Sequence, residues 1–173
     1  MPQAGPASGA ESGGKATLMA DADRPREGGQ NRPVTDVAVG VLIQADGQFL
    51  LTSRPQGKVY EGYWEFPGGK FEPGERVVQA LRRELLEELG ILVDDVQPWK
   101  TEVVDYPHAL VRLHFCKVTS WSGELQMREA QSFAWQQLPV KVTPVLPGTV
   151  PVLQWLAEER DFGGATHSIA SDA

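Results

Sequence analysis

Three glutamates, Glu84, Glu87 and Glu88, have a spacing that could serve metal-dependent chemistry. On a helix, residues at i, i+3 and i+4 lie on one arc, so their carboxylates crowd together and repel by roughly 0.2–0.5 kcal/mol per pair. A divalent cation reverses this repulsion, and carboxylates favour hard cations such as Mg²⁺ or Mn²⁺. Because a run of glutamates on a helix is more often a solvated face, the spacing needs support from its surroundings.

The residues around these glutamates predict the helix that positions them. Apolar side chains recur on one face at 100° per residue, which is typical of a helix packed on a core. They are Val78, Leu81, Leu85 and Leu89. Gly90 is a typical residue just beyond a helix end. We therefore expect a helix that begins after the turn at 72–75 and ends near Leu89, with the carboxylates beside its buried face.

Other elements must complete the domain. Apolar runs and alternations predict strands at 37–43, 48–52, 64–66, 98–105, 110–118 and 132–135. We expect hairpin turns at 45–47 and 120–123. Pro151 suits the start of a second helix, over 152–159. Strands mixed with two helices predict an α+β or layered α/β/α domain.

Composition limits the class of protein. The chain has 173 residues, 41% of them hydrophobic, and a formal net charge of −7. Cys116 is the sole cysteine, which excludes an internal disulfide framework. The acidic charge argues against polymeric nucleic acid as a partner, and the sequence lacks an apolar run of ~20 residues or a secretory signal. We expect a cytoplasmic protein, monomeric or dimeric, that is not bound to a membrane.

The two ends differ from the middle of the chain. Residues 1–33 are rich in Gly, Pro and Ala and poor in large apolar side chains, so they are expected to form a disordered tail. Residues 163–173 read as a flexible tail as well. A single domain is therefore expected over 34–162.

Residues 69–91 resemble the Nudix box. They read Gly-x5-Glu-x7-Arg-Glu-Leu-x-Glu-Glu-x-Gly-Ile and match its pattern at every specified position. The resemblance implies a Nudix hydrolase with an α/β/α sandwich fold, a mixed central sheet and the box as a loop–helix–loop. Such enzymes cleave a nucleoside diphosphate linked to another moiety, using Mg²⁺ or Mn²⁺.

The resemblance also implies roles for single residues. The positions that match metal-binding residues are Gly69, through its backbone carbonyl, and Glu84, Glu87 and Glu88. Glu75 matches the first box glutamate, which assists outside the primary ligands. Arg83 matches the arginine that orients a metal-binding glutamate. The three box glutamates and Arg83 are thus the first candidate catalytic residues.

The stretch 64–75 further resembles the MutT branch, whose members remove oxidised guanine nucleotides from the pool. Arg54 and Lys70 correspond to cations expected to bind phosphates. Residues 128–131 resemble a basic-Glu-Gly-Gln segment of that branch, so Glu129 matches a further metal ligand or the general base. The branch mechanism has water attack the β-phosphorus, which gives a monophosphate and pyrophosphate, with 8-oxo-dGTP as the first candidate substrate.

At the positions that contact the base, the sequence departs from the MutT pattern. Thr149 stands where the branch usually carries an asparagine, and a hydroxyl cannot make the two contacts of an amide. The position of a base-contacting arginine falls near Ala109, with His108 as the candidate replacement. Phe66 could stack on a base or belong to the core. CTP or modified dCTP, ADP-ribose, and a non-catalytic nucleotide sensor therefore remain as alternatives.

Overall fold

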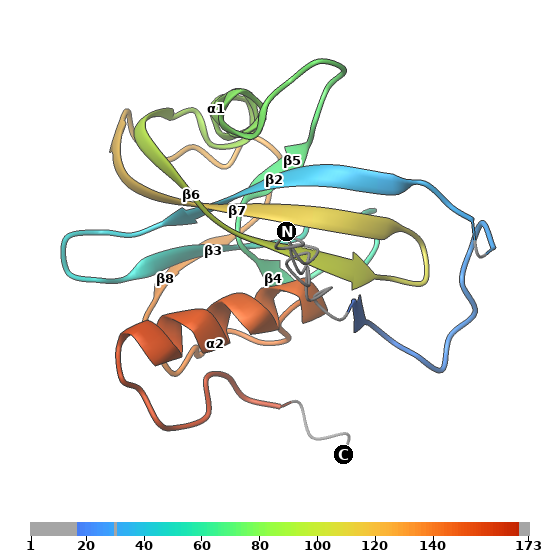
Figure 1. The fold of residues 1–173 in the computed structure, drawn as a ribbon. Coiled ribbons are helices and arrows are strands. Elements are labelled where there is room, and N and C mark those ends of the chain that lie inside the picture. The colour runs from blue at the N-terminus through green and yellow to red at the C-terminus, as the bar shows by residue number, and fades with distance from the viewer. Residues whose placement is uncertain (1–16, 30, 170–173) are drawn as a thin grey trace, which may run out of the picture.

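The chain folds into two sheets between two helices (Figure 1). The computed structural model describes residues 17–29 and 31–169. The elements are β1 (Leu18–Met19), β2 (Val34–Leu42), β3 (Phe49–Ser53), β4 (Trp64–Glu65), β5 (Gly68–Lys70), α1 (Val77–Leu89), β6 (Leu92–Asp105), β7 (Leu110–Ser122), β8 (Phe133–Gln136), η1 (Pro147–Thr149) and α2 (Val150–Glu159). One sheet has the order β1-β6-β7-β2-β5 and mixes parallel with antiparallel pairs, and the other has the order β4-β3-β8.

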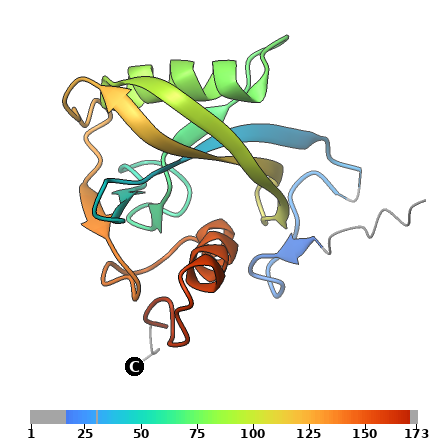
Figure 2. The ribbon, with the colours of Figure 1, turned by 60° about the vertical axis from the view of Figure 1, so that its left-hand side comes forward.

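Strand β2 has two buried faces because side chains alternate along a strand. Ala38 and Leu42 pack in the cluster that includes α1, whereas Val39 and Val41 pack in the cluster that includes α2. Both views show α1 above the sheets and α2 below them (Figures 1 and 2). The predicted α/β/α sandwich with a mixed sheet is therefore confirmed. Neither helix of the described part of the chain is long and apolar enough to cross a membrane.

The long hairpin of β6 and β7 extends beyond the predicted strands. The turn expected at 120–123 is wrong, because β7 continues to Ser122, which pairs with Leu92. Register shifts near Asp95 and Trp99 interrupt the alternation of side chains. These irregularities hide the strand from a simple reading of apolar periodicity.

The N-terminal residues expected to form a disordered tail pack on the domain from residue 18 onwards. Leu18 and Met19 pair with β6, and Ala20 is buried against a cluster that includes Val104. Arg32 forms an ion pair with Asp105, which further fixes this segment. Long-range partners thus order residues that their composition marks as a tail, whereas residues 1–16 lie outside the described part.

The C-terminal segment also packs on the domain over 163–169. Val140 donates its backbone N–H to the carbonyl of Thr166 at 2.7 Å, and forms a bridge with His167. Thr166 is buried by this contact. A flexible tail is therefore a wrong description of 163–169, and 170–173 lie outside the described residues.

Candidate active site

Helix α1 places its carboxylates beside the core. It buries Ala80, Leu81, Leu85 and Leu89, so the adjacent arc of the helix lies at the edge of the sheet. The side chain of Glu84 is only 14% exposed, whereas that of Glu87 is 57% exposed. The helix ends at Gly90, whose φ of 69° is a left-handed conformation that suits glycine.

Arg83 connects three pieces of the Nudix-like segment. Its Nε and Nη2 donate to the two carboxylate oxygens of Glu75, each at 2.8 Å. Nη2 also donates to the carbonyl of Lys70 at 2.9 Å. Nη1 donates to Glu84 at 2.8 Å and to Glu87 at 3.3 Å. A guanidinium has five N–H donors, and all five are used here.

Glu75 is the main counter-charge of Arg83. Its carboxylate also accepts the backbone N–H of Glu72 at 2.6 Å. The hydrogen bonds from Arg83 and then from Glu72 lower the pKa of Glu75 to about 2. Glu75 and Arg83 therefore lie behind the cavity and hold the side chains that face it.

Strand β5 brings its backbone against the first of these carboxylates. Gly69 pairs with Ala38 of β2, and a Cβ at Gly69 would overlap the carboxylate of Glu84. A side chain at this position would therefore displace the Glu84 carboxylate from the place it occupies here. The position predicted to contribute a backbone carbonyl is thus in direct contact with Glu84.

The loop after β7 brings Glu129 to the same place. Arg128 donates its backbone N–H to the carbonyl of Glu88 at 3.1 Å and its Nη1 to that of Leu86 at 3.0 Å. These bonds satisfy carbonyls at the C-terminal end of α1, where a cation is favoured. Arg128 therefore fixes the loop so that Glu129 lies near the helix carboxylates.

The acidic groups of the site repel one another. Burial is the main cause that raises the pKa of Glu88, to about 9, and the charges of Glu129 and Glu84 add to it. Burial raises the pKa of Glu65 as well, against the opposing effect of Arg54, whose Nη1 lies 3.2 Å from both Glu65 oxygens.

A cavity of about 710 Å³ gathers these side chains, a volume within the range of small-ligand sites. The predicted site residues that line it are Arg54, Phe66, Gly69, Lys70, Glu84, Glu87, Glu88, His108, Glu129 and Thr149. Arg83 is not among the lining residues and reaches the cavity through Glu84. The fold therefore brings together residues from four loops, the strand β5, the helix α1 and the 3-10 helix η1.

The predicted base-binding residues differ in how they reach the cavity. Phe66 is 4% exposed and packs 5.7 Å from the ring of Phe49, so it is chiefly a core residue with one side on the cavity. Thr149 is 3% exposed at the end of η1. His108 lies in the β6–β7 turn, and its Nδ1 is buried without a hydrogen-bond partner among the described residues. Burial and the charge of Arg54 lower the pKa of His108.

Glu65, Tyr60 and Tyr106 are among the lining residues that were not predicted from the sequence. Glu65 lies in β4 between Trp64 and Phe66, and a carboxylate flanked by two aromatic residues is a signal that could have been used. Tyr60 and Tyr106 come from two separate turns, and their ring centroids lie 5.5 Å apart in the folded chain. No sequence spacing relates these two tyrosines, so only the fold reveals the pair.

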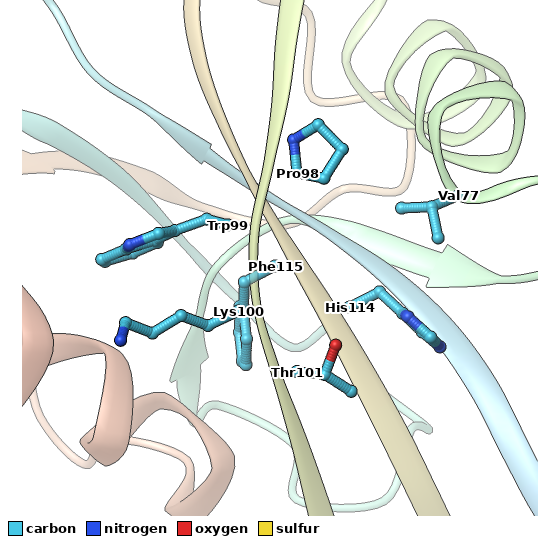
Figure 3. A pocket seen from close by; sticks show the side chains of 7 residues that line it. All are labelled: Val77, Pro98, Trp99, Lys100, Thr101, His114 and Phe115. Atoms are coloured by element: carbon cyan, nitrogen blue, oxygen red, sulfur yellow. The ribbon is translucent and has the colours of Figure 1, made fainter. Parts of the chain in front are cut away.

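A second hollow of about 330 Å³ lies along the paired strands β6 and β7 (Figure 3). Trp99 and Lys100 lie on one side of the strands, and Val77 and His114 lie on the other. Trp99 is the extra residue at a register shift between β6 and β7, which spreads the side chains apart. None of the predicted site residues lines this hollow.

The donor set of the main cavity fits a hard divalent cation. Burial raises the pKa of Glu88 and the charges of Glu129 and Glu84 raise it further, so a proton or a cation is needed to offset the negative charge gathered here. Every candidate ligand is a carboxylate or a carbonyl oxygen, which suits Mg²⁺ or Mn²⁺. Within the described residues, no group of three or more acidic, His or Cys side chains is already arranged as a metal site.

Comparison with known proteins gives consistent matches over the same part of the chain. The family model of the NUDIX domain matches residues 34–156. The chain is 36% identical to 8-oxo-dGTP diphosphatase of Haemophilus influenzae over 105 residues, which cover 61% of this chain and 77% of that protein. It is also 36% identical to CTP pyrophosphohydrolase of Escherichia coli over 117 residues, which cover 67% and 87%.

A solved structure matches as well. It belongs to work on MutT from the fish pathogen Aliivibrio salmonicida and from Vibrio cholerae. The TM-score is 0.61 at 29% sequence identity, and the match covers 73% of this chain and 99% of the other. Fold and sequence therefore point to the same group of proteins.

Proposed function

This chain belongs to the NUDIX domain family of hydrolases, and from that premise we propose that it cleaves a nucleoside triphosphate to the monophosphate and pyrophosphate. The first substrate we propose is 8-oxo-dGTP, after the name of the Haemophilus influenzae relative. One observation carries the proposal. A single cavity is lined by acidic, cationic and aromatic side chains. Acidic side chains of this kind would serve the hydrolysis, the cations would hold the phosphates, and the aromatic rings would contact the base.

The cationic side chains would hold the phosphates. Lys70 is exposed at the end of β5 and lines the cavity. Arg54 uses Nη1 for Glu65 and Nε for the carbonyl of Val59 at 2.5 Å, so its guanidinium is held in place. We propose that Arg54 reaches a phosphate with Nη2, since planar guanidinium groups bind phosphate oxygens well.

The acidic side chains would carry the hydrolytic step. Glu84, Glu87, Glu88, Glu129 and the carbonyl of Gly69 would hold Mg²⁺ or Mn²⁺. Such a cation, when bound, neutralises phosphate charge and makes water more acidic. Glu129 or a glutamate of α1 would accept the proton of the attacking water. The bond then breaks between the β-phosphorus and the oxygen that bridges it to the α-phosphorus. The nucleoside monophosphate leaves with that oxygen, and the other product is pyrophosphate.

A pyrimidine substrate is the second candidate. Thr149 occupies the position at which the MutT branch usually carries an asparagine, and its hydroxyl offers fewer contacts to an oxidised guanine. The Escherichia coli relative is named for CTP and is as identical to this chain as the Haemophilus influenzae relative. CTP or a modified dCTP would leave the proposed hydrolytic residues unchanged.

The test is pyrophosphate release with Mg²⁺ from matched low concentrations of 8-oxo-dGTP, dGTP and CTP, with AMP release from ADP-ribose as a fourth arm. A preference in kcat/KM for 8-oxo-dGTP over dGTP supports removal of oxidised nucleotides. A preference for CTP or ADP-ribose moves the substrate and keeps the enzyme class. Absence of turnover with all four would overturn the proposal and favour a nucleotide sensor.

A further inference from the structure

One wall of the main cavity is aromatic. Tyr60, Tyr106 and His108 line it, with ring centroids 5.5 Å apart for Tyr60–Tyr106, 5.9 Å for Tyr60–His108 and 5.3 Å for Tyr106–His108. We call these three side chains the aromatic wall. The rings are tilted by 36–60° to one another, so a planar base would stack on the face of one ring and contact the edges of the others. The hydroxyl of Tyr106 also accepts the backbone N–H of Gly148 at 2.9 Å, which joins the wall to η1 and Thr149.

The N-terminal segment, residues 17–29 and 31–33, holds the turn that carries Tyr106 and His108. Ala20 donates its backbone N–H to the carbonyl of Asp105 at 2.9 Å, and Glu27 donates to that of Pro107 at 2.7 Å. Figure 2 shows this segment beside the β6–β7 turn. The two bonds bracket Tyr106, so they fix the backbone from which the wall projects.

The same segment also holds the third ring. The hydroxyl of Tyr60 donates a hydrogen bond to Oδ2 of Asp21. Both residues have a left-handed backbone, with φ of 59° for Tyr60 and 46° for Asp21. Such values are uncommon for residues other than glycine, and they persist where surrounding contacts enforce them. The Asp21–Tyr60 bond therefore helps to hold Tyr60 in this conformation.

We propose that the N-terminal segment is a specificity element of this enzyme, in which Asp21 positions Tyr60 so that the aromatic wall receives the base of the nucleotide. This inference rests on the proposed function. The NUDIX match begins at residue 34, so the segment lies outside the part of the chain that defines the family. Asp21 is a positioning residue here, because it acts through Tyr60 and does not line the cavity.

The test compares point variants of the full chain. Asp21→Asn and Tyr60→Phe each weaken the bond, and their double variant measures coupling. Matched controls are Asp23→Asn, an exposed acid of the same segment, and Tyr63→Phe, whose ring lies 5.1 Å from Tyr60. Steady-state kcat and KM are measured for 8-oxo-dGTP, dGTP and CTP, together with thermal unfolding of each variant.

We expect KM for the preferred nucleotide to rise about fivefold in Asp21→Asn and Tyr60→Phe, the size of one lost hydrogen bond, while kcat stays within about twofold. The ratio of kcat/KM between the three bases should change, and the double variant should be no worse than Tyr60→Phe. Both controls should keep the wild-type values. Unchanged KM and base ratios would overturn the inference, as would an equal fall in kcat for every nucleotide.

A wild-type protein that hydrolyses none of the nucleotides would refute the proposed function separately. Base preference would then be read from isothermal titration with the same three nucleotides. Loss of that preference in Asp21→Asn supports the specificity element. Equal preference in wild type and Asp21→Asn would contradict it.

Discussion

The substitution Glu88→Gln should abolish turnover and yet stabilise the protein when divalent cations are removed. Burial and the charges of Glu129 and Glu84 raise the pKa of Glu88 to about 9. At pH 7 the carboxyl therefore holds a proton in the folded chain and releases it in the unfolded chain. Folding must take up that proton, which costs free energy, and a glutamine has no proton to take up.

The size of the effect follows from linkage. Stability falls as pH rises from 4.5, the ordinary pKa of a glutamate, towards 9, because the folded state binds the additional proton over this interval. At 1.36 kcal/mol per pH unit, the cost at pH 7 is at most about 3 kcal/mol. Because neighbouring carboxylates share the proton, we expect Glu88→Gln to raise the free energy of unfolding by about 1–3 kcal/mol, or the Tm by roughly 2–12 °C.

Thermal unfolding in EDTA at pH 4.5 and pH 7 measures this gain, and pyrophosphate release with Mg²⁺ measures turnover. The gain should be largest at pH 7 and close to zero at pH 4.5, and turnover should fall by about 100-fold or more. Glu87→Gln is the matched control for stability, since its side chain is 57% exposed and surface substitutions usually change stability by less than about 0.5 kcal/mol.

Two stability results would refute this reasoning, and one activity result would refute the role of Glu88. A Glu88→Gln protein that is no more stable than wild type at pH 7 in EDTA would show that burial and the neighbouring charges do not raise the pKa of Glu88 as described. A gain that stays the same at pH 4.5 would show that packing, not proton uptake, is its cause. Wild-type turnover in this variant would remove Glu88 from the proposed catalytic group.

Three further predictions concern the groups around the cavity. Arg83→Lys leaves three N–H donors in place of five, so it should release Glu84 and lower kcat by about 100-fold. The control is Arg82→Lys, which should keep kcat because Arg82 donates to the backbone carbonyls of Val93 and Asp94. Ala130→Gly should raise stability by about 1 kcal/mol in chemical unfolding, because Ala130 has φ 58°; a loss of stability would contradict this. Thr149→Asn should raise the kcat/KM ratio of 8-oxo-dGTP to dGTP, and an unchanged ratio would show that Thr149 does not contact the base.

The helix and the inner strands could be predicted because their information is local. The apolar period of α1, its end at Gly90 and the spacing of its glutamates all lie within 13 residues and their neighbours. The order of residues 17–33 could not be predicted in this way. It depends on pairs such as Arg32–Asp105, whose members are 73 residues apart.

The candidate site shows the same division. A local motif points to Glu84, Glu87, Glu88 and Arg83, and the cavity does contain the three carboxylates. Glu65 escapes such a reading because a single acid in a two-residue strand has no periodicity. Its importance comes from Arg54 beside it and from the nearby charge of Glu129, which are set by the fold.

The hydrogen bonds of Arg83 have a consequence for the motions of the molecule. They join the turn at 72–75, the backbone of β5 and the helix α1 through one side chain. Segments that are hydrogen-bonded to the same side chain tend to unfold locally together, not one at a time. Backbone amides of β5 and α1 should therefore exchange with deuterium at a common rate, and Arg83→Lys should let β5 exchange ahead of the helix.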